Sequence, residues 1–312
     1  MMSITLNPGY AGRAKVPPEL LARCVVQQMM PPTEAPDLNV ALFRGLLGRF
    51  GFLESDALAP KLCALMAAMR DQCKKRHHYD FGLRFQMSVM RQAGRLLALD
   101  PSLDETELLA LSILKPMWAK ADDADRGVVL NLMGELMGST PTVPASWTVP
   151  GAEGKAAMMG SVFESRHGGM MLADRGGATA DTLAALQAEA AARQAELVVV
   201  NYDGEGWEER FTEAFREASA SGRPVWLTTD MTNLPWIEDW GFSPHPAFWE
   251  NMNALLDDNK VLRTRAGEEL PLQPDMRILF VAPPSVPANM SPAAVSRLGF
   301  VDATTFDTPT GG

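Results

Sequence analysis

The stretch RHGGMMLADRGGATADTLAAL, residues 166–186, reads as a strand, a glycine-containing turn and a helix in direct succession. An apolar run from Gly169 to Leu172 is short enough for a buried strand, and helix-forming residues follow from Thr179. This is the layout of a phosphate-binding loop, in which a strand leads through a tight turn into a helix. The turn has no lysine, so the stretch predicts the shape of a nucleotide-binding module without its usual phosphate-binding cation.

The rest of the second half continues this alternation of strands and helices. Further strands are predicted at 196–203, 224–230 and 276–282, helices at 179–194, 207–222 and 246–258, and a hairpin that turns near Ala266–Gly267. Gly222 is the expected end of the second of these helices. Strands that alternate with helices predict a layered α/β domain with a mostly parallel sheet.

The first half shows helical periodicity instead. Helices are predicted at 54–76, 79–98, 100–114 and 123–138, with Ser102 or Asp104 as the cap of the third. A stretch rich in Pro, Ser, Thr and Gly follows and has little periodicity of either kind. The predicted fold class is therefore α/β plus α, with a helical domain at 1–138, a linker at 139–154 and an α/β domain at 155–312.

Composition and net charge limit the kinds of partner and compartment that are expected for this chain. The chain has 312 residues and a formal net charge of −10, which argues against attraction to nucleic acid or to an anionic membrane surface. Its three cysteines have no metal-binding or redox spacing and suit a reducing compartment, so no metal site is predicted. No apolar run approaches the length of a membrane span, and no signal peptide opens the chain, so the cytoplasm is the expected compartment.

Four motifs carry a resemblance to a known family. They are LNPGYAGR at 6–13, HHYDFGLRFQMSVMRQAG at 77–94, FWENMNALLDDNKVL at 248–262 and MSPAAVSRLGFV at 290–301. In this order and at this spacing they resemble the AAA+ motor ring of the dynein heavy chain family. The resemblance covers the end of a first AAA+ module with its helical lid and the large part of a second module. The segment RHGGMM resembles the axonemal dyneins more than the cytoplasmic ones.

The resemblance implies roles for three polar residues at the nucleotide site of the first module. Asn7 takes the position of a sensor on a core strand, and Arg84 that of a lid sensor that reaches back to the phosphates. Arg297 takes the position of an arginine finger presented to the preceding module, a role that suits the planar, permanently charged guanidinium. Read without the resemblance, these residues are a turn asparagine, a surface arginine and an arginine at a helix end.

The second module departs from the family pattern in its phosphate loop. Thr179 stands where the lysine is expected, Ala178 replaces a glycine, and Ala180 replaces the hydroxyl residue that would hold magnesium. Each lost charge-assisted hydrogen bond is worth about 1.5–3 kcal/mol. Asp174 adds a negative charge beside the phosphate position. The loop is therefore predicted to keep the shape of a phosphate-binding loop without being a working site.

Other parts of the second-module site are retained. Gly176 and Gly177 still permit a tight turn, and Asp230 stands where the magnesium-side carboxylate is expected. An insertion after Asp230 separates two segments, PWIED and FWENM, that both resemble the start of the next family helix. Nothing before residue 1 supplies the first module's own phosphate loop, so the centre of that site is expected to come from elsewhere.

The predicted function is a dynein-like AAA+ ring segment, structural or auxiliary in a microtubule-based motor assembly, without a complete ATPase site of its own. The alternative is an ATP-binding AAA+ ATPase that uses an atypical phosphate loop. No cofactor is firmly expected, although ATP or ADP with Mg²⁺ follows from the resemblance. The implied partners are other dynein-like AAA+ modules or dynein subunits, with microtubules contacted only indirectly, in the cytoplasm, the cytoskeleton or a ciliary axoneme.

Overall fold

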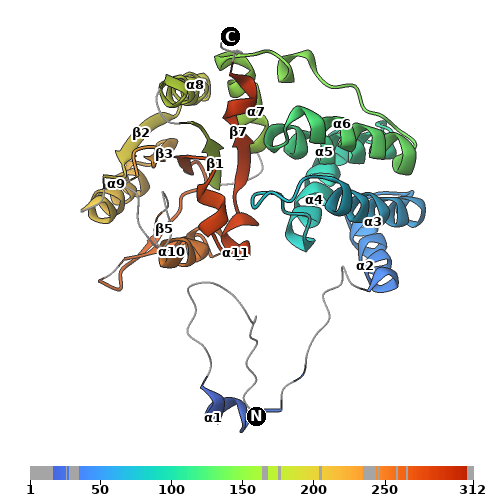
Figure 1. The fold of residues 1–312 in the computed structure, drawn as a ribbon, viewed down its shortest axis with the longest axis horizontal. Coiled ribbons are helices and arrows are strands. Elements are labelled where there is room, and N and C mark those ends of the chain that lie inside the picture. The colour runs from blue at the N-terminus through green and yellow to red at the C-terminus, as the bar shows by residue number, and fades with distance from the viewer. Residues whose placement is uncertain are drawn as a thin grey trace.

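The protein is described by a computed structural model with two parts side by side, one helical and one built around a sheet (Figure 1). The description covers residues 17–25, 27, 35–163, 168–174, 177–203, 206–234, 244, 246–257, 259–264 and 266–307. Asn7 and Gly176 lie outside these residues, so the structure says nothing about either of them.

The second part contains a five-stranded sheet in the order β2-β3-β6-β1-β7, and all four strand pairs are parallel. Its strands are β1 (Gly168–Leu172), β2 (Glu196–Asn201), β3 (Val225–Asp230), β6 (Arg277–Ala282) and β7 (Gly299–Asp302). The predicted parallel sheet is confirmed, and β7 is an additional strand that the sequence analysis does not include.

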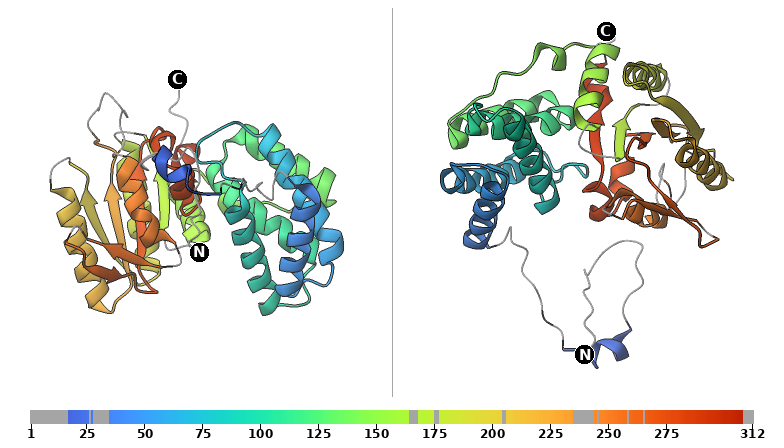
Figure 2. Two further views of the ribbon diagram at one scale, coloured as in Figure 1. Left: turned by 90° about the horizontal axis from the view of Figure 1, so that it is seen from below. Right: turned by 180° about the vertical axis from the view of Figure 1, so that it is seen from behind.

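The central strands are buried on both faces, because helices cover the sheet from each side. In β1, Met171 belongs to one core, whereas Met170 and Leu172 on the opposite face belong to the other. Helices α7 (Ala152–Phe163) and α8 (Gly177–Ala192) pack on the first face. Helices α9 (Trp207–Ser221), α10 (Pro246–Leu256) and the short α11 (Pro292–Val295) pack on the second, as the two views of Figure 2 show.

The predicted helical character of the first part is confirmed. Its long helices are α3 (Ser55–Gln72), α4 (Leu83–Leu99), α5 (Glu105–Lys120) and α6 (Asp123–Leu132), followed by a π-helical turn, η2 (Met133–Met137). Asp104 caps α5, since its Oδ1 accepts a hydrogen bond of 2.8 Å from the amide of Glu107. The one-turn α1 (Pro18–Leu21) and the four-turn α2 (Pro36–Arg49) are not among the predicted helices.

The two parts share a continuous core. Helix α5 packs against β7 at one edge of the sheet, and the apolar core of the helical part extends onto the face covered by α7 and α8. The irregular stretch before α7, which contains the 3₁₀ turn η3 (Ala145–Trp147), is held to this core. Trp147 is buried, and its carbonyl accepts a hydrogen bond of 3.2 Å from Nε1 of Trp118. The stretch predicted as a linker is therefore anchored to the core at Trp147, and its last residues form the start of α7.

The predicted hairpin and helix end are confirmed. Strands β4 (Val261–Arg263) and β5 (Glu269–Pro271) pair antiparallel, with Gly267 in the turn at φ 82°. Helix α9 ends at Gly222, whose φ of 63° lies in the left-handed region that favours glycine. Two 3₁₀ turns, η4 (Val286–Asn289) and η5 (Ala303–Phe306), complete the elements. Within the described residues, no helix is long and apolar enough to cross a membrane.

Candidate functional site

The loop after β1 lies at the carboxyl end of the sheet, where ligands bind in open parallel α/β folds. Ala173 continues the strand, since its amide donates to the carbonyl of Ala282 at 3.0 Å. Helix α8 then begins at Gly177. The buried Thr179 donates from Oγ1 to the carbonyl of Asp174 at 2.9 Å. The side chain at the lysine position is therefore neutral, short and turned back onto its own loop.

Asp230 lies at the same edge of the sheet, two strands away from this loop. Its side chain is buried, with 9% of the residue exposed. Its Oδ1 accepts hydrogen bonds from the amide of Thr232 at 2.9 Å and from Oγ1 of Thr232 at 2.6 Å. These bonds fix the carboxylate in the turn that follows β3, facing the carboxyl end of the sheet, where such ligands bind in α/β folds.

The described residues at this edge of the sheet offer few ligands for a magnesium nucleotide. Mg²⁺ prefers several oxygen ligands, and Asp230 is the one carboxylate that stands at an expected position. Ala180 offers no hydroxyl, and Thr179 uses its hydroxyl on Asp174. Among the described residues, no group of three or more His, Cys, Asp or Glu side chains could hold a metal ion.

Arg84 lies where the helical part meets the sheet-containing part. It occupies the second position of α4, and its Nη1 donates to Oγ of Ser296 at 3.2 Å. Ser296 in turn donates to the carbonyl of Ala293 at 2.9 Å. The structure thus brings Arg84 to the residue next to Arg297, and the lid-sensor role of Arg84 stays a prediction.

Arg297 lies just after the short helix α11, in keeping with its interpretation as an arginine at a helix end. Ser291 caps α11 by accepting from the amide of Ala294 at 3.3 Å, and Pro292 stands in its first turn. The orientation of the arginine differs from expectation, because its side chain is only 15% exposed and points into its own domain. Its Nη1 donates to the carbonyl of Ala293 at 2.8 Å, and its Nη2 lies 3.9 Å from Oδ2 of Asp257.

The reason for this orientation is the packing of α10 against α11, which places the carboxylate of Asp257 beside the guanidinium. In the isolated chain Arg297 is thus an arginine at a helix end that pairs with a local carboxylate. The role of Arg297 as a finger toward a neighbouring module stays a prediction.

A second polar cluster at the junction was not found by sequence reasoning. Arg76 forms ion pairs with Asp122 in the helical part and, at 3.3 Å, with Asp302 at the end of β7. Burial raises the pKa of Asp302, although Thr304 donates to its Oδ1 at 2.6 Å. Arg76 and Asp302 stand 226 positions apart, and no local signal in the sequence links them.

Arg126 makes a further polar link across the junction. It is buried, and its Nε and Nη2 donate to the carbonyl of Trp118 at 3.1 and 2.9 Å. Its Nη2 also lies 3.0 Å from Oγ1 of Thr305, and its guanidinium lies 5.2 Å from the ring centre of Phe306. The two parts are therefore joined by fixed charges as well as by apolar packing.

His78 belongs to the same junction. It is buried, its ring lies 5.7 Å from the ring of Phe300 in β7, and its Nε2 lies 3.2 Å from the carbonyl of Lys120. Burial lowers its pKa to about 4, so the imidazole is neutral at pH 7. A neutral ring with Nε2 protonated donates to the Lys120 carbonyl, which makes His78 a packing residue.

The parallel sheet order, the loop at its carboxyl edge and the adjoining helical part define an AAA+ fold. Residues 1–149 match the sequence model of the hydrolytic ATP binding site of the dynein motor region. The chain is 31% identical to dynein axonemal heavy chain 3 of Homo sapiens and 32% identical to that of Mus musculus. It is 28% identical to the dynein-1-beta heavy chain, flagellar inner arm I1 complex, of Chlamydomonas reinhardtii.

The chain belongs to the dynein heavy chain family. Each of these alignments covers 96% of the chain and 7% or 8% of the relative. The chain therefore spans less than a tenth of the length of the relatives it matches.

Proposed function

We propose that the chain is an AAA+ ring segment that acts in a structural or auxiliary role in a dynein-type assembly, without a complete ATPase site in its second module. One observation carries this proposal: the hydroxyl of Thr179, at the lysine position, donates to the carbonyl of Asp174. A neutral group that is already engaged within the loop cannot neutralise a triphosphate.

Charge supports the same proposal. Phosphoryl transfer depends on cations placed at the phosphates, and each charge-assisted hydrogen bond contributes about 1.5–3 kcal/mol. The loop offers the exposed carboxylate of Asp174, and the neighbouring edge offers the buried carboxylate of Asp230. Two negative groups and the missing lysine disfavour a nucleotide, and Arg175 is the cation that the loop sequence retains.

The names of the relatives support a location and a set of partners. They are axonemal and flagellar heavy chains, so the proposed setting is the cytoskeleton of a cilium. The proposed partners are other dynein AAA+ modules or dynein subunits, and contact with microtubules is indirect. In that setting Arg84 and Arg297 would serve a nucleotide held mainly by a neighbouring module.

A second candidate is an ATP-binding AAA+ ATPase with an atypical loop. The position of Asp230 favours it, because the carboxylate is fixed at the edge where magnesium would be held. Gly177 also begins α8, and the N-terminus of a helix is a place where backbone amides bind anions.

Calorimetric titration of the whole chain with ATP and ADP, with and without Mg²⁺, distinguishes the two. The proposal predicts no saturable binding below about 1 mM, which corresponds to about −4 kcal/mol. A variant that restores the loop, Ala178→Gly/Thr179→Lys/Ala180→Thr, is expected to gain binding, with Thr179→Ala as the matched control. Micromolar, magnesium-dependent binding by the unaltered chain, lost on Asp230→Asn, would establish the second candidate instead.

A further inference from the structure

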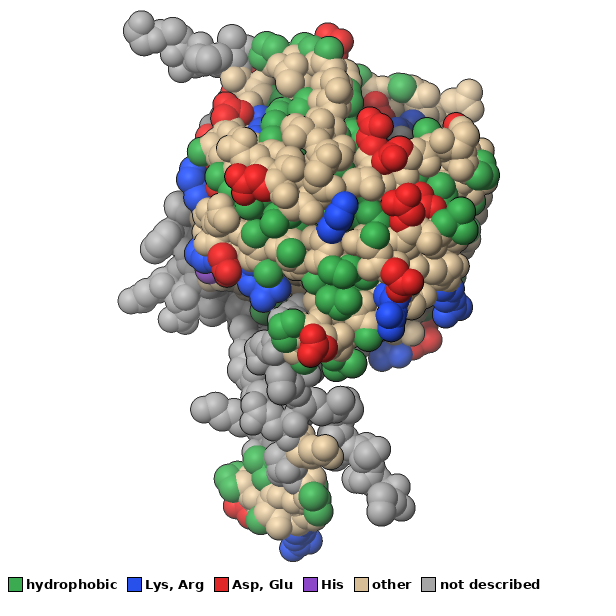
Figure 3. Space-filling view, turned by 90° about the vertical axis from the view of Figure 1, so that its right-hand side faces the viewer, with side chains coloured by type: hydrophobic (Ala, Val, Ile, Leu, Met, Phe, Trp, Pro, Cys, Tyr) green, Lys and Arg blue, Asp and Glu red, His purple; other side chains and the backbone are tan. Residues whose placement is uncertain are grey.

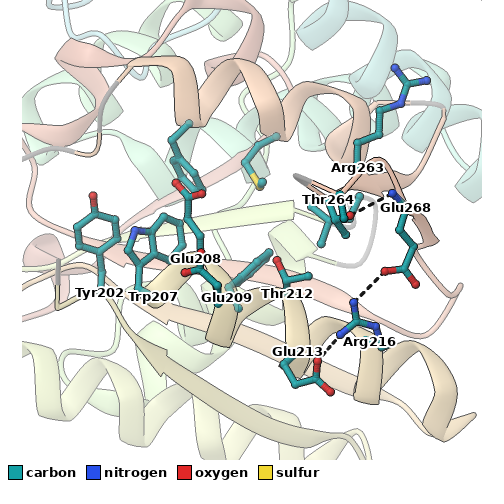
Figure 4. A pocket seen from close by; sticks show the side chains of 15 residues that line it. Tyr202, Trp207, Glu208, Glu209, Thr212, Glu213, Arg216, Arg263, Thr264 and Glu268 are labelled. Atoms are coloured by element: carbon teal, nitrogen blue, oxygen red, sulfur yellow. Dashed lines mark hydrogen bonds and ion pairs between the residues drawn. The ribbon is translucent and has the colours of Figure 1, made fainter. Parts of the chain in front are cut away.

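A pocket unrelated to the phosphate loop lies between α9, α10 and the β4–β5 hairpin (Figure 4). Its cavity volume is about 650 Å³, within the usual range for small-ligand sites of about 300–1,000 Å³. The pocket is open on one side, and it contains none of the residues assigned to nucleotide chemistry above. Any role for it is therefore independent of the proposed function.

One wall of the pocket is aromatic. Trp207 opens α9, and its ring centre lies 4.6 Å from that of Tyr202 and 4.9 Å from that of Phe248. The Trp207 and Phe248 rings meet edge to face at 73°, so they do not lie in one plane. Tyr202 is only partly buried, so its ring is the more exposed part of this aromatic wall.

The polar wall of the pocket is acidic. Glu208 and Glu209 follow Trp207 in the first turn of α9, and Glu213 and Glu268 stand at the far end. Figure 4 shows Glu208 and Glu209 near Trp207, and Arg216 between Glu213 and Glu268. The four glutamates outnumber the two arginines of the lining, Arg216 and Arg263, so the lining has an excess of negative charge.

Both arginines of the lining are held by carboxylates. Arg216 pairs with Glu213 and, at 2.8 Å, with Glu268, while Nε of Arg263 lies 3.0 Å from Oε1 of Glu269. These pairs neutralise the two arginines and equally involve the carboxylates of Glu213 and Glu268. The other two carboxylates of the lining belong to Glu208 and Glu209, and each of them also interacts with other parts of the chain. The end of the cavity beside Trp207 and Tyr202 therefore combines aromatic rings with carboxylates and has no lysine or arginine in its lining.

We propose that this pocket binds a hydrophobic organic cation, namely an ammonium or guanidinium group attached to an apolar body. Aromatic rings attract a cation through their negative faces, by about 0.5–2 kcal/mol as the site becomes desolvated. The glutamates add charge complementarity, and the buried Trp207, Phe211 and Phe248 supply apolar area for the rest of the ligand. A free amine and a lysine or arginine side chain of a partner protein share this chemistry.

The aromatic and acidic residues of the lining also stabilise the fold, but this structural role does not explain why a cavity is present. Trp207 and Phe248 contribute to the core over the second face of the sheet. Glu208 and Glu209 stabilise the N-terminus of α9 through the helix dipole. Neither duty requires an open cavity of about 650 Å³ bordered by both sets of side chains.

Ligand-observed NMR titration of the whole chain tests the proposal with three probes of similar size. Benzyltrimethylammonium is the cation, benzyl alcohol the neutral control and phenylacetate the anionic control. The expected affinity for the cation exceeds that for benzyl alcohol by about tenfold, with no measurable binding of phenylacetate. Equal affinity for all three probes, or preference for the anion, would overturn the proposal.

Variants locate the binding. Glu208→Gln/Glu209→Gln keeps the size of both side chains and is expected to weaken binding of benzyltrimethylammonium by about tenfold. The matched control is Glu217→Gln, an exposed residue of α9 outside the pocket lining, and it is expected to leave the affinity unchanged. Tyr202→Leu tests the aromatic contribution. Full affinity in all of these variants would place binding elsewhere and end the proposal.

Two further probes distinguish the sources of the cation. N-acetyl-arginine amide and N-acetyl-trimethyllysine amide represent side chains presented by a protein. If either binds as tightly as benzyltrimethylammonium, the site suits a partner protein. If only the free amine binds, the site suits a small molecule, and both outcomes support the proposal.

Discussion

Nη1 of Arg84 lies 3.2 Å from Oγ of Ser296, although the two residues stand 212 positions apart in the chain. The bond links the first turn of a helix in the helical part to the end of α11 in the sheet-containing part. A residue expected to sense nucleotide is therefore in contact with the neighbour of the expected arginine finger. The contact places these two positions next to each other in the folded chain.

A double-mutant cycle measures this contact. Arg84→Ala, Ser296→Ala and the double variant are compared by urea unfolding, monitored by circular dichroism. Because Arg84 is an exposed residue, we expect a coupling free energy of only about 0.5 kcal/mol. A coupling of zero would show that the two side chains do not interact in solution. Arg91→Ala, exposed on the same helix, is the matched control for losing an arginine from α4.

His78 predicts a pH dependence of stability. Its pKa is about 4 in the folded chain, against 6.5 for the free group, because burial disfavours the charged ring. Below pH 6.5 the unfolded chain binds a proton that the folded chain does not, so stability is complete above pH 6.5 and is lost as the pH falls toward 4. The loss by pH 4 amounts to about 3 kcal/mol.

Urea unfolding at pH 7.5 and at pH 5.0 tests this expectation, with His78→Gln as the comparison. The variant is expected to lose less stability than the parent chain between the two pH values, because it has no imidazole to protonate. The raised pKa of Asp302 has the opposite sign, since it favours the folded chain at acidic pH. Only the difference between parent and variant therefore reports on His78, and identical pH profiles would contradict the assignment.

Removal of the buried Arg126 is expected to lower the free energy of unfolding more than removal of an exposed arginine does. Arg126→Met keeps much of the apolar stem but leaves the carbonyl of Trp118 without its two donors from this residue. We expect the free energy of unfolding to fall by about 2–4 kcal/mol, since a buried acceptor loses charged partners. Arg49→Met, exposed in the last turn of α2, is the control and is expected to change stability by less than about 0.5 kcal/mol. Equal effects of the two variants would show that the junction does not depend on Arg126.

Local patterns predict the elements of this fold well. The cap at Asp104, the helix end at Gly222 and the turn at Gly267 all follow from the conformational preferences of single residues. Strand β7 escapes prediction because its four residues, Gly299–Asp302, are too few to show a period. Helix α2 has buried residues at three positions, Asn39, Phe43 and Leu47, but one of them is polar, which weakens its apolar pattern.

Contacts between distant residues could not be predicted in this way. The pairing of Arg76 with Asp302 depends on how α5 and β7 bring the two parts together. The pairing of Arg297 with Asp257 depends on the packing of α10 against α11. A family resemblance supplies candidate roles for Arg84 and Arg297, but it does not supply the partners that each side chain has in the isolated chain.

The last prediction concerns Arg297 in an assembled ring. If the arginine serves a nucleotide of the preceding module, its guanidinium must leave Asp257 and turn outward when that module is present. An arginine finger contributes about 10³–10⁵ in rate where it acts. Arg297→Ala is therefore expected to abolish stimulation of the neighbouring ATPase. Arg297→Lys is expected to restore little, because lysine lacks the planar fork that binds phosphate oxygens in pairs.

The variant Asp257→Asn distinguishes a finger role of Arg297 from a purely structural role. It weakens the local ion pair, in which Nη2 and Oδ2 are 3.9 Å apart, but it leaves Arg297 in place. If the arginine is shared between Asp257 and a neighbouring nucleotide, the variant keeps or increases stimulation while Arg297→Ala loses it. If Arg297 only stabilises its own domain, both variants lower the unfolding temperature and neither changes the rate per folded molecule. ATPase assays of the assembled ring, normalised to the folded fraction from thermal unfolding, distinguish the two roles.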